Sequence, residues 1–270
     1  MSDTTELQIE TCYMCERPAT TREHAPPQCF FPKQVDQPAH IRKDLRTNLI
    51  VVPSCDIHNS QKSSNDEYVR FVICSTFNGN EYKRNHWDKK VLKSFQKKHG
   101  KFKKFAPELI PVVLEAPDGT REESAAIRVD QREFDDAIEH IGRALHCHHF
   151  GEKAPTYSII HTAEFLDVSS DNREEVNQVH RDLQDLVDRG FENEPKHGEN
   201  PEVFYYQVKV DEGNNPIFSM TFYETMKVTA GFSLEEPEGV RRRRLRRPVR
   251  DNNPGLREAV RRANRSLIEK

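Results

Sequence analysis

Two short cysteine and histidine pairs are the residues in this chain best suited to chemistry. Two residues separate Cys12 from Cys15, and two separate Cys55 from His58. Zinc in proteins usually takes four tetrahedral ligands from two such pairs. The spacing therefore predicts one structural Zn²⁺ ion bound by all four side chains, whose binding contributes to folding. The simpler alternative is a buried thiol at Cys55 and an exposed imidazole at His58.

The segment between the two pairs has few features that would hold it together without a metal. Residues 11–62 are rich in proline and other turn formers, and one short apolar run, 49–52, predicts a strand. A helix is expected after this segment, because 64–67 forms a capping box and Tyr68, Phe71 and Val72 follow at helical spacing.

Further polar residues stand in a fixed order around the two pairs. They are Glu23-His24-Ala25-Pro26, Asn48-Leu49-Ile50-Val51, and Asn59 with Lys62 three residues later. In this order, residues 12–67 resemble the zinc-containing HNH endonucleases. Two positions depart from the family pattern: Glu23 stands where aspartate is more usual, and His58 where cysteine is commoner. Both residues keep the donor chemistry of the usual ones.

The resemblance implies a ββα-metal fold that hydrolyses DNA phosphodiester bonds. His24 would be the general base, a task that suits imidazole because imidazoles titrate near neutral pH. Glu23 and Asn59 would bind a catalytic Mg²⁺ or a similar divalent ion. Asn48 would hydrogen-bond the loop backbone and so orient His24. Because His58 and Asn59 are adjacent, the sequence is also compatible with an exchange of their roles.

Charge is strongly segregated along the chain. Residues 1–105 carry 18 Lys and Arg against 12 Asp and Glu, and residues 240–270 carry 12 against 3, whereas the stretch between them carries 11 against 29. Seven arginines lie between 241 and 250. Basic ends of this kind favour a polyanionic partner. The alternative for the tail is docking onto the acidic middle of the same chain.

The rest of the chain predicts an α+β fold in several parts. We expect an HNH module at 1–80, a basic helical segment at 81–105, an α+β accessory region at 106–235 and an Arg-rich C-terminal tail at 236–270. Strands are expected at 109–114, 157–165, 203–210, 217–223 and 226–232, and amphipathic helices are expected on Phe134, Ile138, Ile141 and Leu145 and on Val176, Val179, Leu183 and Leu186. The run 146–149 contains three histidines and a cysteine, but consecutive helical positions point in different directions and do not converge on one ion.

Composition favours a cytoplasmic protein with no membrane partner. No apolar run approaches the roughly 18 residues of a membrane span, and the N-terminus lacks a secretory signal. DNA is the expected partner, with RNA as an alternative, and a homodimer or an activating protein is a further expectation. The rival function is a non-catalytic zinc-stabilised module that binds nucleic acid or protein. A redox role for Cys12 and Cys15 is disfavoured, because the strand and helix that flank a thioredoxin-type motif are missing.

Overall fold

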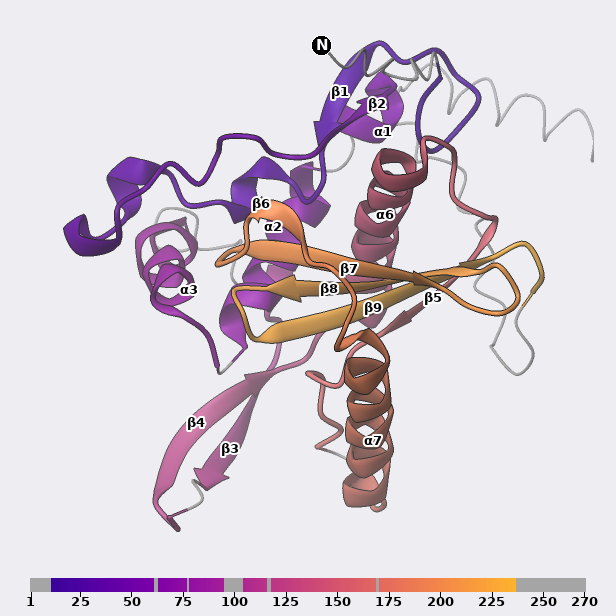
Figure 1. Cartoon of the computed structure of the whole chain (residues 1–270). Coiled ribbons are helices and arrows are strands. Elements are labelled where there is room, and N and C mark those ends of the chain that lie inside the picture. The colour runs from indigo at the N-terminus through magenta and orange to yellow at the C-terminus, as the bar shows by residue number, and fades with distance from the viewer. Residues whose placement is uncertain are drawn as a thin grey trace, which may run out of the picture. The chain divides into compact units, whose positions relative to one another are not determined.

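The computed structural model describes residues 11–60, 63–76, 78–94, 104–115, 118–168 and 170–236. The chain divides into two units, Met1–Glu235 and Glu236–Lys270. The first unit is a mixed α+β structure, as the sequence predicts (Figure 1). The Arg-rich tail lies outside the described residues. None of the described helices is long and apolar enough to span a membrane.

A two-stranded hairpin followed by two helices makes up the N-terminal module, which we define as residues 11–75. Strand β1 (Thr21–His24) pairs antiparallel with β2 (Val51–Ser54). Helices α1 (Asp56–Ser60) and α2 (Ser63–Ser75) follow. The loop between the strands contains three short 3-10 turns: η1 (Gln28–Phe30), η2 (Gln34–Asp36) and η3 (Ala39–Ile41). Pro53 is tolerated in β2 because a two-stranded sheet leaves each strand one edge without a partner.

Helix α6 (Gln131–Phe150) connects this module to the rest of the unit. It begins at Asp130, whose side chain accepts hydrogen bonds from the first-turn amides, and it ends at Gly151 in a left-handed conformation. It packs against α2 and β2 on one side and against the large sheet on the other (Figure 1). Helix α2 contributes a buried side to this core. Residues of the N-terminal module and of α6 therefore share one core.

The large sheet has five antiparallel strands in the order β5-β9-β8-β7-β6. The strands are β5 (Tyr157–His161), β6 (His197–Asn200), β7 (Phe204–Val210), β8 (Pro216–Phe222) and β9 (Met226–Ser233). One face is apolar and packs on α6, where Phe232 and Ala230 lie close against Gly142. The other face carries a polar row across four strands, and α7 (Arg173–Phe191) lies against it. That row consists of His161, Thr229, Ser219 and Gln207.

A second hairpin extends from the unit. Strand β3 (Leu109–Glu115) matches the prediction of a strand at 109–114. It pairs along its whole length with β4 (Arg121–Ile127), which the sequence did not predict. The chain after β4 is held close to the core, because the Tyr68 hydroxyl accepts a hydrogen bond of 2.6 Å from the Asp130 amide.

The basic segment expected at 81–105 is helical in its described first part. It forms α3 (Glu81–His86) and a π-helical turn, η4 (Trp87–Leu92), while 95–103 lie outside the described residues. Lys83 is buried, and its ammonium donates a hydrogen bond of 2.7 Å to the Thr76 carbonyl. Burial lowers the pKa of Lys83 to about 8. The Lys83 side chain is therefore part of the interior of the fold and is not available to bind phosphate at the surface.

Candidate metal centre

The four predicted zinc ligands come together in one cluster. The ligand atoms of Cys12, Cys15, Cys55 and His58 all lie within 4.8 Å of one another. The His58 Nδ1 atom lies 3.3 to 3.5 Å from each of the three sulfurs, and the Cys15 and Cys55 sulfurs are 3.9 Å apart. Ideal tetrahedral zinc with its usual bond lengths separates sulfur from nitrogen by about 3.6 Å and two sulfurs by about 3.8 Å. The cluster therefore fits a metal ion such as zinc.

The backbone on both sides of the hairpin positions these ligands. Cys12 and Cys15 belong to a tight loop in which the Cys15 amide donates a hydrogen bond of 3.3 Å to the Cys12 carbonyl. This loop is tied to β2, because the Tyr13 amide donates a hydrogen bond of 3.0 Å to the Pro53 carbonyl. Cys55 directly follows β2, and His58 lies one helical turn later in α1. The hairpin thus brings both pairs to one end of the module.

Electrostatics within the cluster favour the ionised sulfur that a metal requires. The pKa of the Cys12 thiol is lowered to about 6. Burial alone would raise this pKa, but the hydrogen bonds from His58 and from the Met14 amide stabilise the thiolate and together have the larger effect. By contrast, burial raises the pKa of Cys29 to about 12 and that of Cys74 to about 11. These other two cysteines of the module lie outside the cluster. Within the cluster the thiolate is favoured at Cys12, whereas burial and the neighbouring sulfurs raise the pKa of Cys15.

The structure turns Glu23 away from His24, as expected for neighbours in a strand. Glu23 is buried, and its Oε2 accepts hydrogen bonds of 3.0 Å from the Tyr13 hydroxyl and 3.4 Å from the Ser54 hydroxyl. His24 lies on the other, more open face of the hairpin together with the exposed Arg22. The predicted pairing of Glu23 with Asn59 on one catalytic ion is therefore not supported by this geometry.

Asn59 is held beside the strand that carries His24. Its side-chain nitrogen donates a hydrogen bond of 3.2 Å to the Arg22 carbonyl. Arg22 and His24 are two residues apart on one face, so roughly 7 Å of strand separates their positions. The nitrogen of the Asn59 side-chain amide is used in this hydrogen bond. The oxygen of the same amide is the atom that could bind a metal ion. The structure thus brings Asn59 and His24 into one neighbourhood.

Asn48 has a different role from the predicted one. Among the described residues its side chain makes no hydrogen bond to the loop backbone. Instead, Asn48 adopts a positive φ of 53°, a conformation that asparagine tolerates better than most residues. It turns the chain into β2, and the Ala25 amide then donates a hydrogen bond of 3.0 Å to the Ile50 carbonyl. Asn48 therefore shapes the hairpin that carries His24 through its backbone.

Sequence reasoning missed the residues that support this hairpin. Tyr13 and Ser54 hold the Glu23 carboxylate, and the Thr20 hydroxyl donates a hydrogen bond of 2.7 Å to Asp56 at the start of α1. Tyr13 was the one sequence signal for such a support, because a large aromatic side chain between two metal-binding cysteines is expected to be buried in a core.

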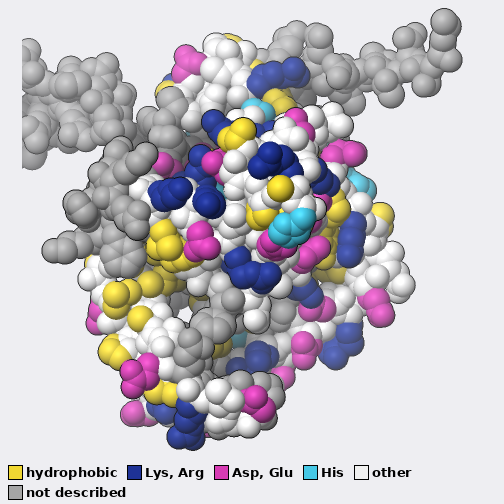
Figure 2. Space-filling model, turned by 90° about the vertical axis from the view of Figure 1, so that its left-hand side faces the viewer, with side chains coloured by type: hydrophobic (Ala, Val, Ile, Leu, Met, Phe, Trp, Pro, Cys, Tyr) yellow, Lys and Arg dark blue, Asp and Glu magenta, His cyan; other side chains and the backbone are white. Residues whose placement is uncertain are grey.

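A basic surface lies on the same unit, on the side that faces left in Figure 1. Figure 2 shows Lys and Arg side chains gathered in the upper part of this side, among some acidic ones. Exposed basic residues of the loop after β1 and of the α3 and η4 region are Lys33, Arg42, Lys43, Arg84, Lys89 and Lys93. Part of this charge is neutralised locally, since Lys43 pairs with Glu202 and Lys90 lies 2.8 Å from Asp36.

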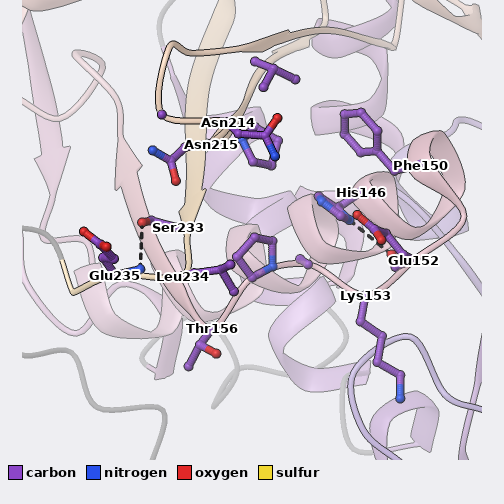
Figure 3. Close-up of a pocket in the computed structure, with 15 residues that line it drawn as sticks. His146, Phe150, Glu152, Lys153, Thr156, Asn214, Asn215, Ser233, Leu234 and Glu235 are labelled. Carbon is purple, nitrogen blue, oxygen red and sulfur yellow. Dashed lines mark hydrogen bonds between the residues drawn. The ribbon is translucent and has the colours of Figure 1, made fainter.

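A cavity of 790 Å³ lies apart from these residues, between the C-terminal end of α6, the β7–β8 turn and the end of β9 (Figure 3). None of the predicted site residues lines it. Its charged side chains are Glu152, Glu235 and Lys153, and Lys153 is paired at 2.7 Å with Glu16. An acidic lining of this kind disfavours a polyanion.

Comparison of the chain with protein-family models, curated proteins and solved structures gives no match.

Proposed function

We propose that this protein is a metal-dependent endonuclease of the HNH class that hydrolyses DNA phosphodiester bonds, with a structural zinc ion in the Cys12, Cys15, Cys55 and His58 cluster. The observation that carries the proposal is the placement of His24 and Asn59. His24 lies in β1, and Asn59 is hydrogen-bonded to the backbone of the same strand, in a two-stranded hairpin whose end is next to a cluster able to bind a metal ion. This arrangement agrees with the ββα-metal fold that the sequence resemblance implies.

The proposed chemistry assigns one step to each side chain on the face of the hairpin that carries His24. The imidazole of His24 takes a proton from a water molecule as the water oxygen attacks the scissile phosphorus. The phosphorus–oxygen bond to the leaving group then breaks, and the leaving oxygen receives a proton from solvent. Arg22, exposed on the same face, is suited to hold the phosphate by charge-assisted hydrogen bonds.

A divalent ion such as Mg²⁺ would stabilise the negative charge that develops on the phosphate and the leaving oxygen. The oxygen of the Asn59 amide is its candidate protein ligand, and magnesium commonly keeps several waters or substrate oxygens besides one or two protein ligands. Glu23 is not required for this ion, because its carboxylate is engaged with Tyr13 and Ser54 inside the module.

The function is tested by plasmid cleavage. Purified protein is incubated with supercoiled DNA in Mg²⁺, in Mn²⁺ and without added divalent ion, and nicked and linear products are separated on a gel. The variants are His24→Ala and His40→Ala, the second being an exposed histidine of the same module as a matched control. We expect metal-dependent cutting that His24→Ala abolishes and His40→Ala keeps. The zinc content of each variant shows that the cluster is intact.

A second function has one observation in its favour. The inward orientation of Glu23 leaves fewer acidic oxygens at the open face than a two-carboxylate nuclease site would have. A non-catalytic module that binds nucleic acid would need the cluster and the basic surface but not His24. Equal DNA binding by the wild type and His24→Ala, with no cutting by either protein in any metal, would favour this function over the endonuclease.

A further inference from the structure

Helix α7 carries its apolar stripe on the side that faces solvent. Val176, Val179, Leu183 and Leu186 recur at spacings of three, four and three residues, which places them in one row along the helix. The side chains of Val179, Leu183 and Leu186 are 61%, 42% and 60% exposed. In Figure 1, α7 projects below the sheet with much of its length away from the other labelled helices. The sequence predicted an amphipathic helix here, but its apolar side does not face the core.

A neighbouring side of α7, adjacent to the stripe, contacts the sheet mainly through polar side chains. The Lys227 ammonium lies 2.6 Å from the Asp188 carboxylate, and the Gln207 amide donates a hydrogen bond of 2.7 Å to the Phe191 carbonyl. The rings of His161 and His180 stack with their centres 5.5 Å apart. These contacts match the polar row on that face of the sheet. Rotating α7 to bury its apolar stripe would break these contacts, so the stripe stays exposed on the unit and available to a partner.

We propose that the apolar stripe of α7 binds the same stripe of a second copy of this chain, with the two helices antiparallel. The stripe is symmetric about Arg181. An antiparallel pair centred there places Val176 opposite Leu186 of the second copy and Val179 opposite Leu183 of the second copy. The two-fold axis repeats both pairings, so four apolar layers form a continuous seam of the kind found in coiled coils.

Charge complementarity supports the antiparallel orientation. Glu175 lies near the start of α7 and Arg189 near its end, and both are exposed. An antiparallel pair brings Glu175 of each copy close to Arg189 of the other, whereas a parallel pair would leave these two residues at opposite ends of the dimer. The helix carries five acidic residues against three arginines, which disfavours binding of the stripe to an anionic lipid surface.

The size of the seam indicates a reversible dimer. A helix of this length extends about 28 Å, and four apolar layers bury less surface than a standard stable interface. The two Asp182 side chains also approach each other at the centre. Leu166 and Val168, 58% and 41% exposed, add apolar surface beside the helix, because Asp167 between them accepts a hydrogen bond of 2.8 Å from Asn177 of α7. We therefore expect dissociation constants on the order of micromolar.

The test measures the mass of the full chain in solution without DNA. Sedimentation equilibrium from about 1 to about 100 µM should show a monomer that converts to a dimer. Leu183→Asp places a charge in the apolar seam and should raise the dissociation constant by about tenfold or more. Leu234→Asp is the matched control, since Leu234 is 78% exposed and lies on no part of α7. Circular dichroism checks that each variant keeps its helices.

A charge exchange tests the orientation. Arg189→Glu should weaken the dimer, and Glu175→Arg combined with Arg189→Glu should restore it, because the opposite charges meet again with their positions exchanged. A wild-type chain that stays monomeric over the whole concentration range would overturn the proposal. So would association that Leu183→Asp leaves unchanged. Failure of the double variant to restore association would overturn the antiparallel arrangement. Because these are mass measurements, their outcome is independent of the nuclease proposal.

Discussion

The Tyr13 hydroxyl donates a hydrogen bond of 3.0 Å to the Glu23 carboxylate in the interior of the N-terminal module. Tyr13 lies between two of the clustered cysteines, and Glu23 precedes His24 in β1. Burial, followed by the nearby charge of Glu23, raises the pKa of Tyr13 well above its usual value, so the hydroxyl keeps its proton as the donor. The loop that carries Cys12 and Cys15 is therefore joined to β1 by this side-chain contact, while the cluster joins the same loop to Cys55 and His58 after β2.

Substitutions of Glu23 should therefore affect stability more than chemistry. Glu23→Leu removes the acceptor of the buried Tyr13 hydroxyl and should lower the free energy of unfolding by about 1 to 3 kcal/mol. Glu23→Gln keeps an acceptor oxygen, so it should cost less and retain plasmid nicking. Urea unfolding and the plasmid assay measure the two effects. If Glu23→Gln unfolds like the wild type but no longer cuts DNA, the carboxylate is instead a ligand of the catalytic ion.

Removal of one cluster ligand should remove the metal and much of the module's stability. Cys55→Ala should bind no stoichiometric zinc, and a loss of even 3 kcal/mol would lower the Tm by about 10 °C in a unit of this size. Zinc is measured by atomic emission and the Tm by circular dichroism. The control is Cys29→Ala, because Cys29 belongs to the same module but lies outside the cluster. A Cys55→Ala variant that retains one zinc per chain would contradict the assignment.

Asn59→Ala tests the proposed ligand of the catalytic ion. The variant loses the amide oxygen and the hydrogen bond to the Arg22 carbonyl, so DNA nicking should fall by about 100-fold or more at low Mg²⁺. Raising the Mg²⁺ concentration should recover part of the activity, which a purely structural role would not predict. Zinc content should stay at the wild-type level. Unchanged nicking at every Mg²⁺ concentration would exclude Asn59 from the site.

The buried His86 should make the unit sensitive to acid. Burial lowers the pKa of His86 to about 3, from 6.5 in the unfolded chain. Below pH 6.5 the unfolded chain therefore binds a proton that the folded chain does not. The contribution of His86 to stability is complete above about pH 6.5 and declines as the pH falls towards 3.

His86→Asn isolates this effect, because asparagine does not titrate but can still donate to the Tyr223 hydroxyl, which lies 2.7 Å from the His86 Nδ1 atom. Between about pH 6.5 and about pH 5, the wild type should lose about 2 kcal/mol of unfolding free energy more than the variant. Urea unfolding at each pH gives the difference in unfolding free energy between the wild type and the variant. Effects of acid on the metal cluster are the same in both proteins and cancel in this difference. Parallel pH profiles would contradict the assignment.

The sequence predicted the parts of the fold in which a short sequence pattern is enough to determine the local structure. The two ligand pairs come together as a cluster because their spacing is set by the metal geometry alone. Strands β7, β8 and β9 agree with their predicted bounds to within about a residue, because large apolar residues alternate along them. Strands β4 and β6 were not predicted, because their residues are mostly polar or small and their pairing depends on the neighbouring strand.

The directions of side chains were harder to predict than the elements themselves. The pair Glu23-His24 suggests two residues acting together, yet a strand sends them to opposite faces. Lys83 has the spacing of a surface residue, but backbone carbonyls near residue 76 offer its ammonium a buried partner. Likewise, the sequence shows the apolar stripe of α7, but it does not show that the helix contacts the sheet through a polar row that β5, β7, β8 and β9 form together.

Tyr223 connects the sheet to the N-terminal module by a buried hydrogen bond. It sits in the turn between β8 and β9 with a positive φ of 49°, is fully buried, and donates a hydrogen bond of 2.5 Å to the Phe30 carbonyl in the loop after β1. A chain cut before the sheet would lose this hydrogen bond to the Phe30 carbonyl and also the contact between the Tyr223 hydroxyl and His86. The sheet thus supports the N-terminal module from outside it, and a displacement of the β8–β9 turn is transmitted to the backbone six residues beyond His24.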